Sequence, residues 1–300
     1  YQMWLAVALF GIGGPLISVG VPKASSLWKS QKKRTISMGI LFTGPMFGGI
    51  VSLSTMNSIL MPLLNSNWKL VYFFYSLIPF ISGLIWLIII NNKPILNIQK
   101  DAILNISRSI SEFKLIITKK RFLIILILGT SAMFLVHGVP GWIPKILFSK
   151  GISIGLASLL ATIPIVIGII SALTVPRFTN NDTRIKILAL LFINAAFSLL
   201  LLQSNNLMIF IIGLFFLGIS TGSLIAIILN HLSETKDISY NNIGIAGGLF
   251  FSIIEIGGVL GPFFIGLIYD LYNNFNVALC LYALLMFIMI FPLYILKNKI

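Results

Sequence analysis

Long stretches without a single charged side chain dominate this 300-residue chain and limit what it can fold into. Seven such stretches lie at 1–22, 35–68, 70–92, 122–144, 151–176, 187–233 and 271–296, and an eighth, 239–269, contains only Glu255. A helix that crosses the hydrocarbon core of a bilayer needs about 20 predominantly apolar residues. The stretch 187–233 is long enough for two helices, with Gln203-Ser204-Asn205-Asn206 as the turn between them. The sequence therefore predicts an all-α, polytopic membrane protein with nine spans, at 2–22, 37–62, 69–91, 122–146, 152–175, 186–203, 207–230, 243–268 and 275–296.

The low charge content excludes several classes of protein. Charged residues make up 9% of the chain, whereas a soluble domain usually has about a quarter. This leaves too little polar surface to cover a globular domain, which excludes a soluble enzyme, a disulfide-linked secreted module and a disordered tail. The single Cys280 lies in an apolar run, so there is no disulfide framework and no cysteine-based metal site. We expect neither a metal nor a cofactor.

The basic residues predict the orientation of the chain in the cell membrane. Of the 21 Lys and Arg residues, 18 fall on one side of the predicted spans, and Lys69, Lys145 and Lys150 fall on the other. Positive charge concentrates in cytoplasmic loops, so the C-terminus and the long loop 92–121 are expected inside the cell. Apolar spacing in 92–121 suits either a helix on the inner membrane surface or a solvated linker. The net charge of +14 thus marks loops and does not indicate a nucleic-acid partner.

An internal repeat relates the two ends of the chain. The segment 39–49 matches 248–258 at a shift of 209 residues, and 68–77 matches 275–284 at a shift of 207. The matched segments belong to spans one to three and spans seven to nine, which predicts a repeat unit of six spans. Spans four to six then lack counterparts, and the chain starts at Tyr1 without a charged leader region. We therefore expect an N-terminally truncated chain that carries nine of twelve helices.

Several motifs in this chain resemble those of the major facilitator superfamily, over essentially the whole length. They are Gly- and Pro-rich helix ends and basic loop residues, at Phe10–Pro15, Pro22–Trp28, Lys33-Arg34, Gly39–Gly49, Trp68-Lys69, His137–Pro144, Gly151–Ser153, Glu255–Pro262, Gly266 and Asp270. The resemblance implies two six-helix bundles that work by alternating access. Residues 1–91 would be the last three helices of the first bundle, 92–121 the interbundle loop and 122–300 the second bundle. Within the superfamily the chain looks most like the cyanate and nitrate porter-like branch and related prokaryotic anion or organic-acid carriers.

Glu255 is the only carboxylate inside a predicted span, and it falls near the bilayer centre. An ionised acid at that depth is costly, so such residues are usually neutralised, paired or turned towards a cavity. Glu255 could therefore couple transport to protons. The structural alternative is a protonated carboxyl group that bonds to a neighbouring backbone near Gly257 and Gly258.

His137 is the second candidate, because the following segment Gly138–Pro144 predicts a break in the helix that frees backbone groups for a ligand. Its imidazole could take a proton or hold an anion, or it could bond to a helix neighbour. Other polar and aromatic residues could contact a substrate, although each has a structural alternative as a snorkelling cation, an interfacial anchor or an interhelical hydrogen bond. They are Lys23, Trp142, Ser220, Thr221 and Asn230.

These observations favour a secondary active transporter of a small solute, expected to be an anion or organic acid, which works as a monomer and is coupled to protons, with symport, antiport and uniport left open. Two alternatives stay open. A membrane-embedded enzyme normally needs clustered acids with a metal, or a nucleophile with a base, and 7 scattered acids with 2 histidines offer no such cluster. A transporter-like sensor that binds a ligand without moving it has the same composition.

Overall fold

The computed structural model describes residues 4–13, 44–91, 115–180, 182–233, 235 and 243–298, and these are almost entirely helical, with no strand among them. The predicted all-α class is therefore confirmed. The chain divides into two compact units, residues 1–52 and 53–300.

The first unit is described in two helical parts. Trp4–Gly13 is a short apolar helix, and residues 44–52 are helical, with Ser52 Oγ donating to the carbonyl oxygen of Gly49 at 3.1 Å. The predicted span 2–22 is thus helical over residues 4–13, while its remainder and Lys23 lie outside the described residues.

The second unit contains the following elements: η1 (Met56–Leu60), α3 (Met61–Leu63), α4 (Trp68–Asn91), α6 (Lys120–Gly138), η2 (Pro140–Trp142), α7 (Ile143–Ser149), α8 (Ile154–Leu160), α9 (Ile163–Thr174), η3 (Val175–Phe178), α10 (Arg184–Leu201), α11 (Leu207–Ser233), α12 (Ile243–Tyr272), α13 (Phe275–Ile288) and α14 (Ile290–Asn298). In the described part of the chain, 8 helical stretches are long and apolar enough to cross a membrane. They coincide with the last eight predicted spans, and the turn at 203–206 separates α10 from α11 as expected.

Asparagine side chains cap the N-terminal ends of three helices. The side-chain oxygen of Asn67 accepts from the backbone N–H of Lys69 at 3.2 Å, before α4. Asn206 accepts from Met208 N–H at 2.9 Å before α11, and Asn274 caps α13 in the same way. An asparagine at this position satisfies a backbone donor that the first helical turn leaves without a partner. The three caps all lie on the predicted outer side, where the chain turns back into the membrane.

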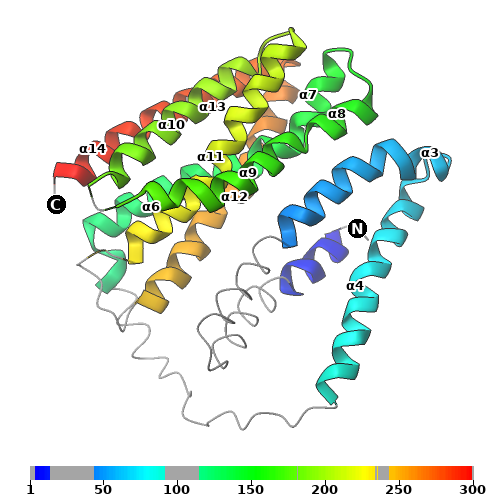
Figure 1. The fold of residues 1–300 in the computed structure, drawn as a ribbon, viewed down its shortest axis with the longest axis horizontal. Coiled ribbons are helices and arrows are strands. Elements are labelled where there is room, and N and C mark those ends of the chain that lie inside the picture. Colours follow the sequence, from blue (N-terminus) through cyan, green and yellow to red (C-terminus); the bar gives the residue numbers. More distant parts are fainter. Residues whose placement is uncertain are drawn as a thin grey trace. The chain divides into compact units, whose positions relative to one another are not determined.

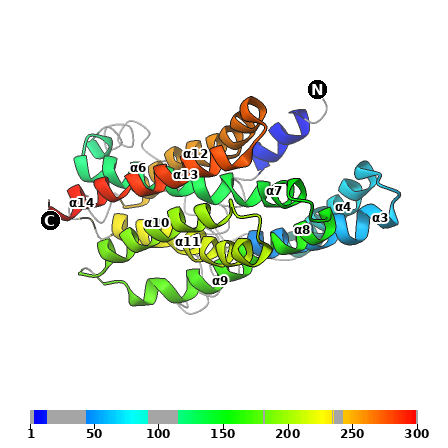
Figure 2. The same ribbon diagram turned by 90° about the horizontal axis from the view of Figure 1, so that it is seen from above.

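The helices of the second unit pack in pairs around an apolar core. Figures 1 and 2 show the set from two directions, and α6 contacts α12, α9 contacts α11, and α10 contacts α13. Small residues allow the close approaches: a Cβ added to Gly168 on α9 would lie 3.5 Å from the carbonyl oxygen of Gly218 on α11, and Ser171 Oγ donates to Ile219 O at 2.8 Å. Because all of these faces are apolar, close packing and interhelical hydrogen bonds hold the pairs together.

The two segments of the predicted repeat share a tyrosine that bonds to the preceding helix. Tyr75 and Tyr282 are the matched tyrosines of the two repeat segments. The hydroxyl of Tyr75, on α4, lies 2.7 Å from Thr55 Oγ1 on the preceding helix. The hydroxyl of Tyr282, on α13, donates to Gly261 O on the preceding helix α12, also at 2.7 Å. In both places a tyrosine thus ties its helix to the one before it.

Of the predicted interbundle loop 92–121, residues 92–114 lie outside the described residues. Residues 115–117 form one helical turn, and α6 begins at Lys120. The predicted boundaries of the bundles, 1–91 and 122–300, therefore stay predictions.

Candidate functional site

The helices α6 and α12 run in the same direction and approach each other closely at Gly129, Gly257 and Gly261, a contact that we call the α6–α12 seam. A Cβ at Gly129 would lie 2.6 Å from the ring of Phe250, and a Cβ at Gly257 or Gly261 would overlap a backbone carbonyl oxygen of α6. The contacts advance along both helices together, which places successive turns of α6 against successive turns of α12. Close backbone approach through small residues is typical of helix pairs in membranes.

His137 and Glu255 meet at this seam. Both side chains are exposed. A Cβ added to Gly258 would lie 2.9 Å from Glu255 Oε2 and 3.2 Å from His137 Nδ1. Because both distances are measured from the same point, Glu255 Oε2 and His137 Nδ1 can be at most roughly 6 Å apart. The two residues chosen separately from the sequence are thus brought together, one from each helix, next to a glycine that leaves room for both.

A proline lies close to this pair on each side of the helix contact. The α6 helix ends at Gly138, and Pro140 opens the short 3-10 turn η2; Pro262 lies inside α12. Proline has no N–H to donate to the residue four positions earlier. The carbonyl groups of Val136 and Gly258 therefore lack their usual helical donor, beside His137 and Glu255 respectively. The end of α6 is the helix break predicted from Gly138–Pro144, whereas α12 continues through Pro262 and is left with one carbonyl group without its helical donor.

Trp142 lies one turn further along the seam. Its indole Nε1–H donates to Pro262 O at 3.1 Å, and its ring edge would lie 3.1 Å from a Cβ at Gly266. The ring also packs 5.8 Å, centroid to centroid, from Phe275. Trp142 therefore fixes η2 against α12.

Tyr282 holds α13 against the same seam and was not among the candidates from the sequence. Its ring stacks on Phe134 of α6 at 4.5 Å, and its hydroxyl bonds to Gly261 O of α12. It is fully buried, so this hydrogen bond satisfies the one polar atom of a core residue. The repeat match between Tyr75 and Tyr282 was the signal that could have identified it.

The remaining sequence candidates lie on α11 or outside the described residues. Ser220 is buried, donates to Leu191 O at 2.9 Å and accepts from Asn194 Nδ2 at 2.7 Å, both on α10. Thr221 Oγ1 bonds within its own helix, to Leu217 O at 3.0 Å. Asn230 is exposed near the end of α11. The hydrogen bonds of Ser220 and Thr221 thus do not reach the His137–Glu255 pair.

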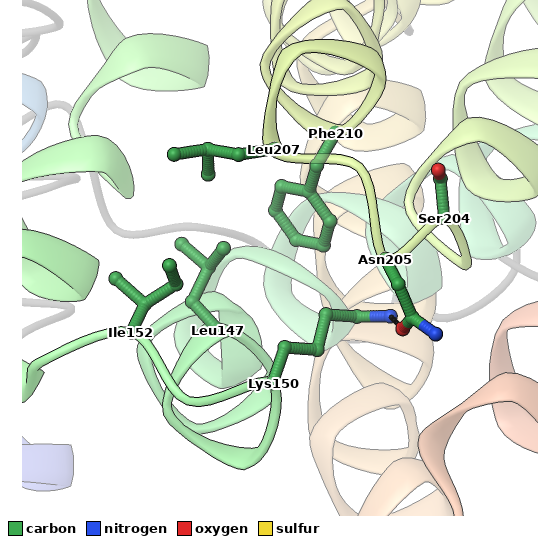
Figure 3. Close-up of a pocket in the computed structure, with 7 residues that line it drawn as sticks. All are labelled: Leu147, Lys150, Ile152, Ser204, Asn205, Leu207 and Phe210. Atoms are coloured by element: carbon green, nitrogen blue, oxygen red, sulfur yellow. Dashed lines mark hydrogen bonds between the residues drawn. The ribbon is translucent and has the colours of Figure 1, made fainter.

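A small pocket lies between the loops that follow α7 and α10, on the predicted outer side (Figure 3). It is lined by Leu147, Lys150, Ile152, Ser204, Asn205, Leu207 and Phe210. Lys150 Nζ donates to Gln203 O at 2.9 Å and to Asn205 Oδ1 at 3.1 Å. Partial burial lowers the pKa of Lys150 through desolvation. Because both contacts fasten one loop to the other, we interpret Lys150 as a structural clamp.

Within the described residues, no group of three or more His, Cys, Asp or Glu side chains is placed to hold a metal ion. The chemistry available at the α6–α12 seam is therefore that of one imidazole, one carboxyl group and freed backbone carbonyls. These groups can exchange protons and can attract or repel an anion.

Comparison with known proteins identifies the family. The sequence profile of the Major Facilitator Superfamily matches residues 1–237. The chain belongs to the Major Facilitator Superfamily. It is therefore a multi-pass membrane transporter, and the alternative of a membrane-embedded enzyme is set aside. The chain is also similar to the hexuronate transporter of Bacillus subtilis (strain 168), with 22% identity over 289 residues, covering 91% of this chain and 67% of the relative. The narrower resemblance to cyanate and nitrate porters stays a prediction.

Proposed function

We propose that this superfamily member moves a small organic anion of the sugar-acid type together with a proton, by alternating access. The observation that carries the proposal is the meeting of His137 and Glu255 at Gly258, in a family of transporters, beside the end of α6 and a proline inside α12. The similarity to a hexuronate transporter supports a carboxylate-bearing sugar as the solute.

Proton coupling follows from the charges of the pair. An ionised Glu255 repels the carboxylate of an approaching substrate, and a protonated Glu255 does not. A protonated His137 attracts the same carboxylate. Binding of the proton and binding of the anion therefore favour each other, and this coupling is reciprocal by thermodynamic necessity. The pair would in this way load a proton with each anion and release both together.

Alternating access would open and close a contact between the predicted bundles. Asn57 Nδ2, on the π-helical turn η1, donates to Ser158 Oγ on α8 at 2.7 Å. Next to it, Ser58 Oγ donates to Gly155 O at 3.2 Å. If residues 1–91 and 122–300 are separate bundles, these two hydrogen bonds join them near the predicted outer ends of their helices. Opening to the outside would require both bonds to break. A π-turn, which is less stable than regular helix, is often found at such functional positions.

The other candidates receive secondary roles in this proposal. Trp142 would position η2 and limit access to the pair. Lys23 and Asn230 would offer polar contacts along the path of the anion, and Ser220 and Thr221 would act by fixing α11. We further propose that the protein works as a monomer, with the C-terminus and the loop 92–121 in the cytoplasm.

Uptake by reconstituted protein tests the proposal. Proteoliposomes should accumulate radiolabelled glucuronate when an inward proton gradient is imposed, and a protonophore should abolish the accumulation. Glu255→Gln should lose gradient-driven accumulation, while Asp182→Asn, which removes an exposed acid from the loop before α10, should keep it. Binding of glucuronate without any flux would indicate a sensor. Failure to bind or move any organic anion would refute the proposed solute class.

A further inference from the structure

Lys145 on α7 lies against two aromatic rings at the end of the α6–α12 seam. Its Nζ is 5.1 Å from the ring centroid of Trp142 and 4.6 Å from that of Tyr269 on α12. Phe275 stands behind both rings, stacked on Tyr269 at 4.2 Å and tilted against Trp142 at 5.8 Å. We call Trp142, Tyr269 and Phe275 the aromatic cage.

The ammonium group of Lys145 has no hydrogen bond or ion pair with any residue in the described part of the chain, and the side chain is exposed. Aromatic faces attract a cation through their quadrupole. They also restrain a flexible four-carbon stem without accepting its N–H groups. The cage therefore orients the lysine and leaves its three donors available to an anion.

The other two lysines on the predicted outer side differ from Lys145. Lys150 donates to a backbone carbonyl and to Asn205, so its donors are partly used. Lys69 lies over a single ring, that of Trp68, at 5.8 Å. Among the described residues of the outer side, Lys145 is thus the cation that two rings hold. Asp270, next to Tyr269 in the chain, is exposed and forms no ion pair with Lys145.

The position of Lys145 connects it to the proposed coupling pair. Contacts along the seam proceed from His137 at Gly258, through Trp142 at Pro262, to Lys145 at Tyr269. Along the continuous helix α12, Tyr269 lies 11 residues beyond Gly258, which is about 16 Å at 1.5 Å per residue, so Lys145 lies towards the predicted outside of His137. An anion that enters along this seam would meet the caged lysine before it reaches the pair.

We propose that Lys145 and the aromatic cage form an outer capture site for the carboxylate group of a small sugar acid. This inference rests on the proposed function, because it names an entry site for the same solute. The ammonium donates charge-assisted hydrogen bonds to the carboxylate, and its field raises the rate at which anions arrive. Loss of the charge should therefore weaken capture without slowing the later steps of transport.

Kinetics of glucuronate uptake in proteoliposomes test this site. Lys145→Met keeps an unbranched apolar stem against the rings and removes the charge. It should raise KM for glucuronate about tenfold and leave the maximal rate within about twofold of the wild type. Lys145→Arg should restore a KM close to that of the wild type. Added salt should raise the wild-type KM and have little effect on that of Lys145→Met, because screening acts on the charge that this variant lacks.

The matched control is Lys69→Met, which removes an outer positive charge held by one ring only, and which should leave KM within about twofold. If the wild type takes up glucuronate and Lys145→Met has the same KM as the wild type, the capture site is overturned and the proposed function is not. An equal rise of KM in both lysine variants would also overturn it, because the effect would then be a property of the overall outer charge. Absence of glucuronate uptake by the wild type would overturn the proposed function and this inference with it.

Discussion

Adding one methyl group at Gly257 should push α6 and α12 apart. The Cβ of an alanine there would overlap the carbonyl oxygen of Thr130 and lie 3.0 Å from its Cγ2. A backbone oxygen cannot rotate out of the way, so the two helices must separate to restore normal contact distances. Gly258, which faces both His137 and Glu255, is the next residue on α12. The separation of the helices would therefore also move His137 and Glu255 apart.

The size of the effect can be worked out with Gly247→Ala as the matched control. That glycine lies on the same helix, and a Cβ there would meet nothing within 4 Å. Both variants gain the helix propensity of alanine over glycine, about 0.8–1.0 kcal/mol. Gly257→Ala in addition carries the cost of overpacking, typically about 1–3 kcal/mol. The propensity gain cancels in the comparison, so the free energy of unfolding of Gly257→Ala should be lower by about 1–3 kcal/mol.

Thermal unfolding in detergent, followed by intrinsic fluorescence, measures this difference directly. Uptake by the same two variants should show reduced proton-driven accumulation only for Gly257→Ala. Equal thermal midpoints for Gly257→Ala and Gly247→Ala would refute the close packing of the seam. A stability loss without any change in proton-driven accumulation would instead refute the link between the seam and the pair.

Three further predictions address the remaining contacts. The double variant Asn57→Cys and Ser158→Cys, in a background without Cys280, should form a disulfide under mild oxidation. The cross-link should stop net uptake until it is reduced. Undiminished uptake by the cross-linked protein would contradict the proposed opening at this contact. Lys150→Met should lower the free energy of unfolding by about 0.5–1.5 kcal/mol at neutral pH through loss of its hydrogen bonds. Desolvation lowers the pKa of Lys150 below its ordinary value of 10.5, so between the two pKa values the unfolded chain binds more protons than the folded chain. The stability of the wild type relative to Lys150→Met should therefore rise with pH in the window up to pH 10.5. A stability difference that does not change with pH would contradict the desolvation of Lys150. Tyr282→Phe should cost about 1 kcal/mol by removing the hydrogen bond from the tyrosine hydroxyl to Gly261 O, and an unchanged thermal midpoint would show that this hydrogen bond contributes nothing.

The helices themselves could be predicted because their signal is local. Charge-free stretches longer than a bilayer crossing correspond to the eight spans found among the described residues. The turn at 203–206 and the helix break after Gly138 followed from polar residues and prolines in the sequence. The extra break at Ala161 and Thr162, between α8 and α9, was not predicted, since Pro164 in the second position of a new helix and Pro within a helix look alike in sequence.

Which helices pair could not be read from the sequence in the same way. Every span is apolar on all sides, so periodicity does not distinguish the face that meets α12 from the face that meets lipid. The glycines at 129, 257 and 261 decide the pairing of α6 with α12, and their effect depends on the register of two distant segments. His137 and Glu255 could be chosen singly, as ionisable residues inside spans. Their meeting, and the cage around Lys145, depend on that register.

Proton movement driven by substrate tests the central claim most directly. Proteoliposomes that contain a pH-sensitive dye and no imposed gradient should acidify internally when glucuronate is added outside to the wild type. Glu255→Gln should still exchange labelled for unlabelled glucuronate across the membrane, without any substrate-driven acidification. A Glu255→Gln variant that acidifies the interior as fast as the wild type, at equal glucuronate flux, would contradict the account.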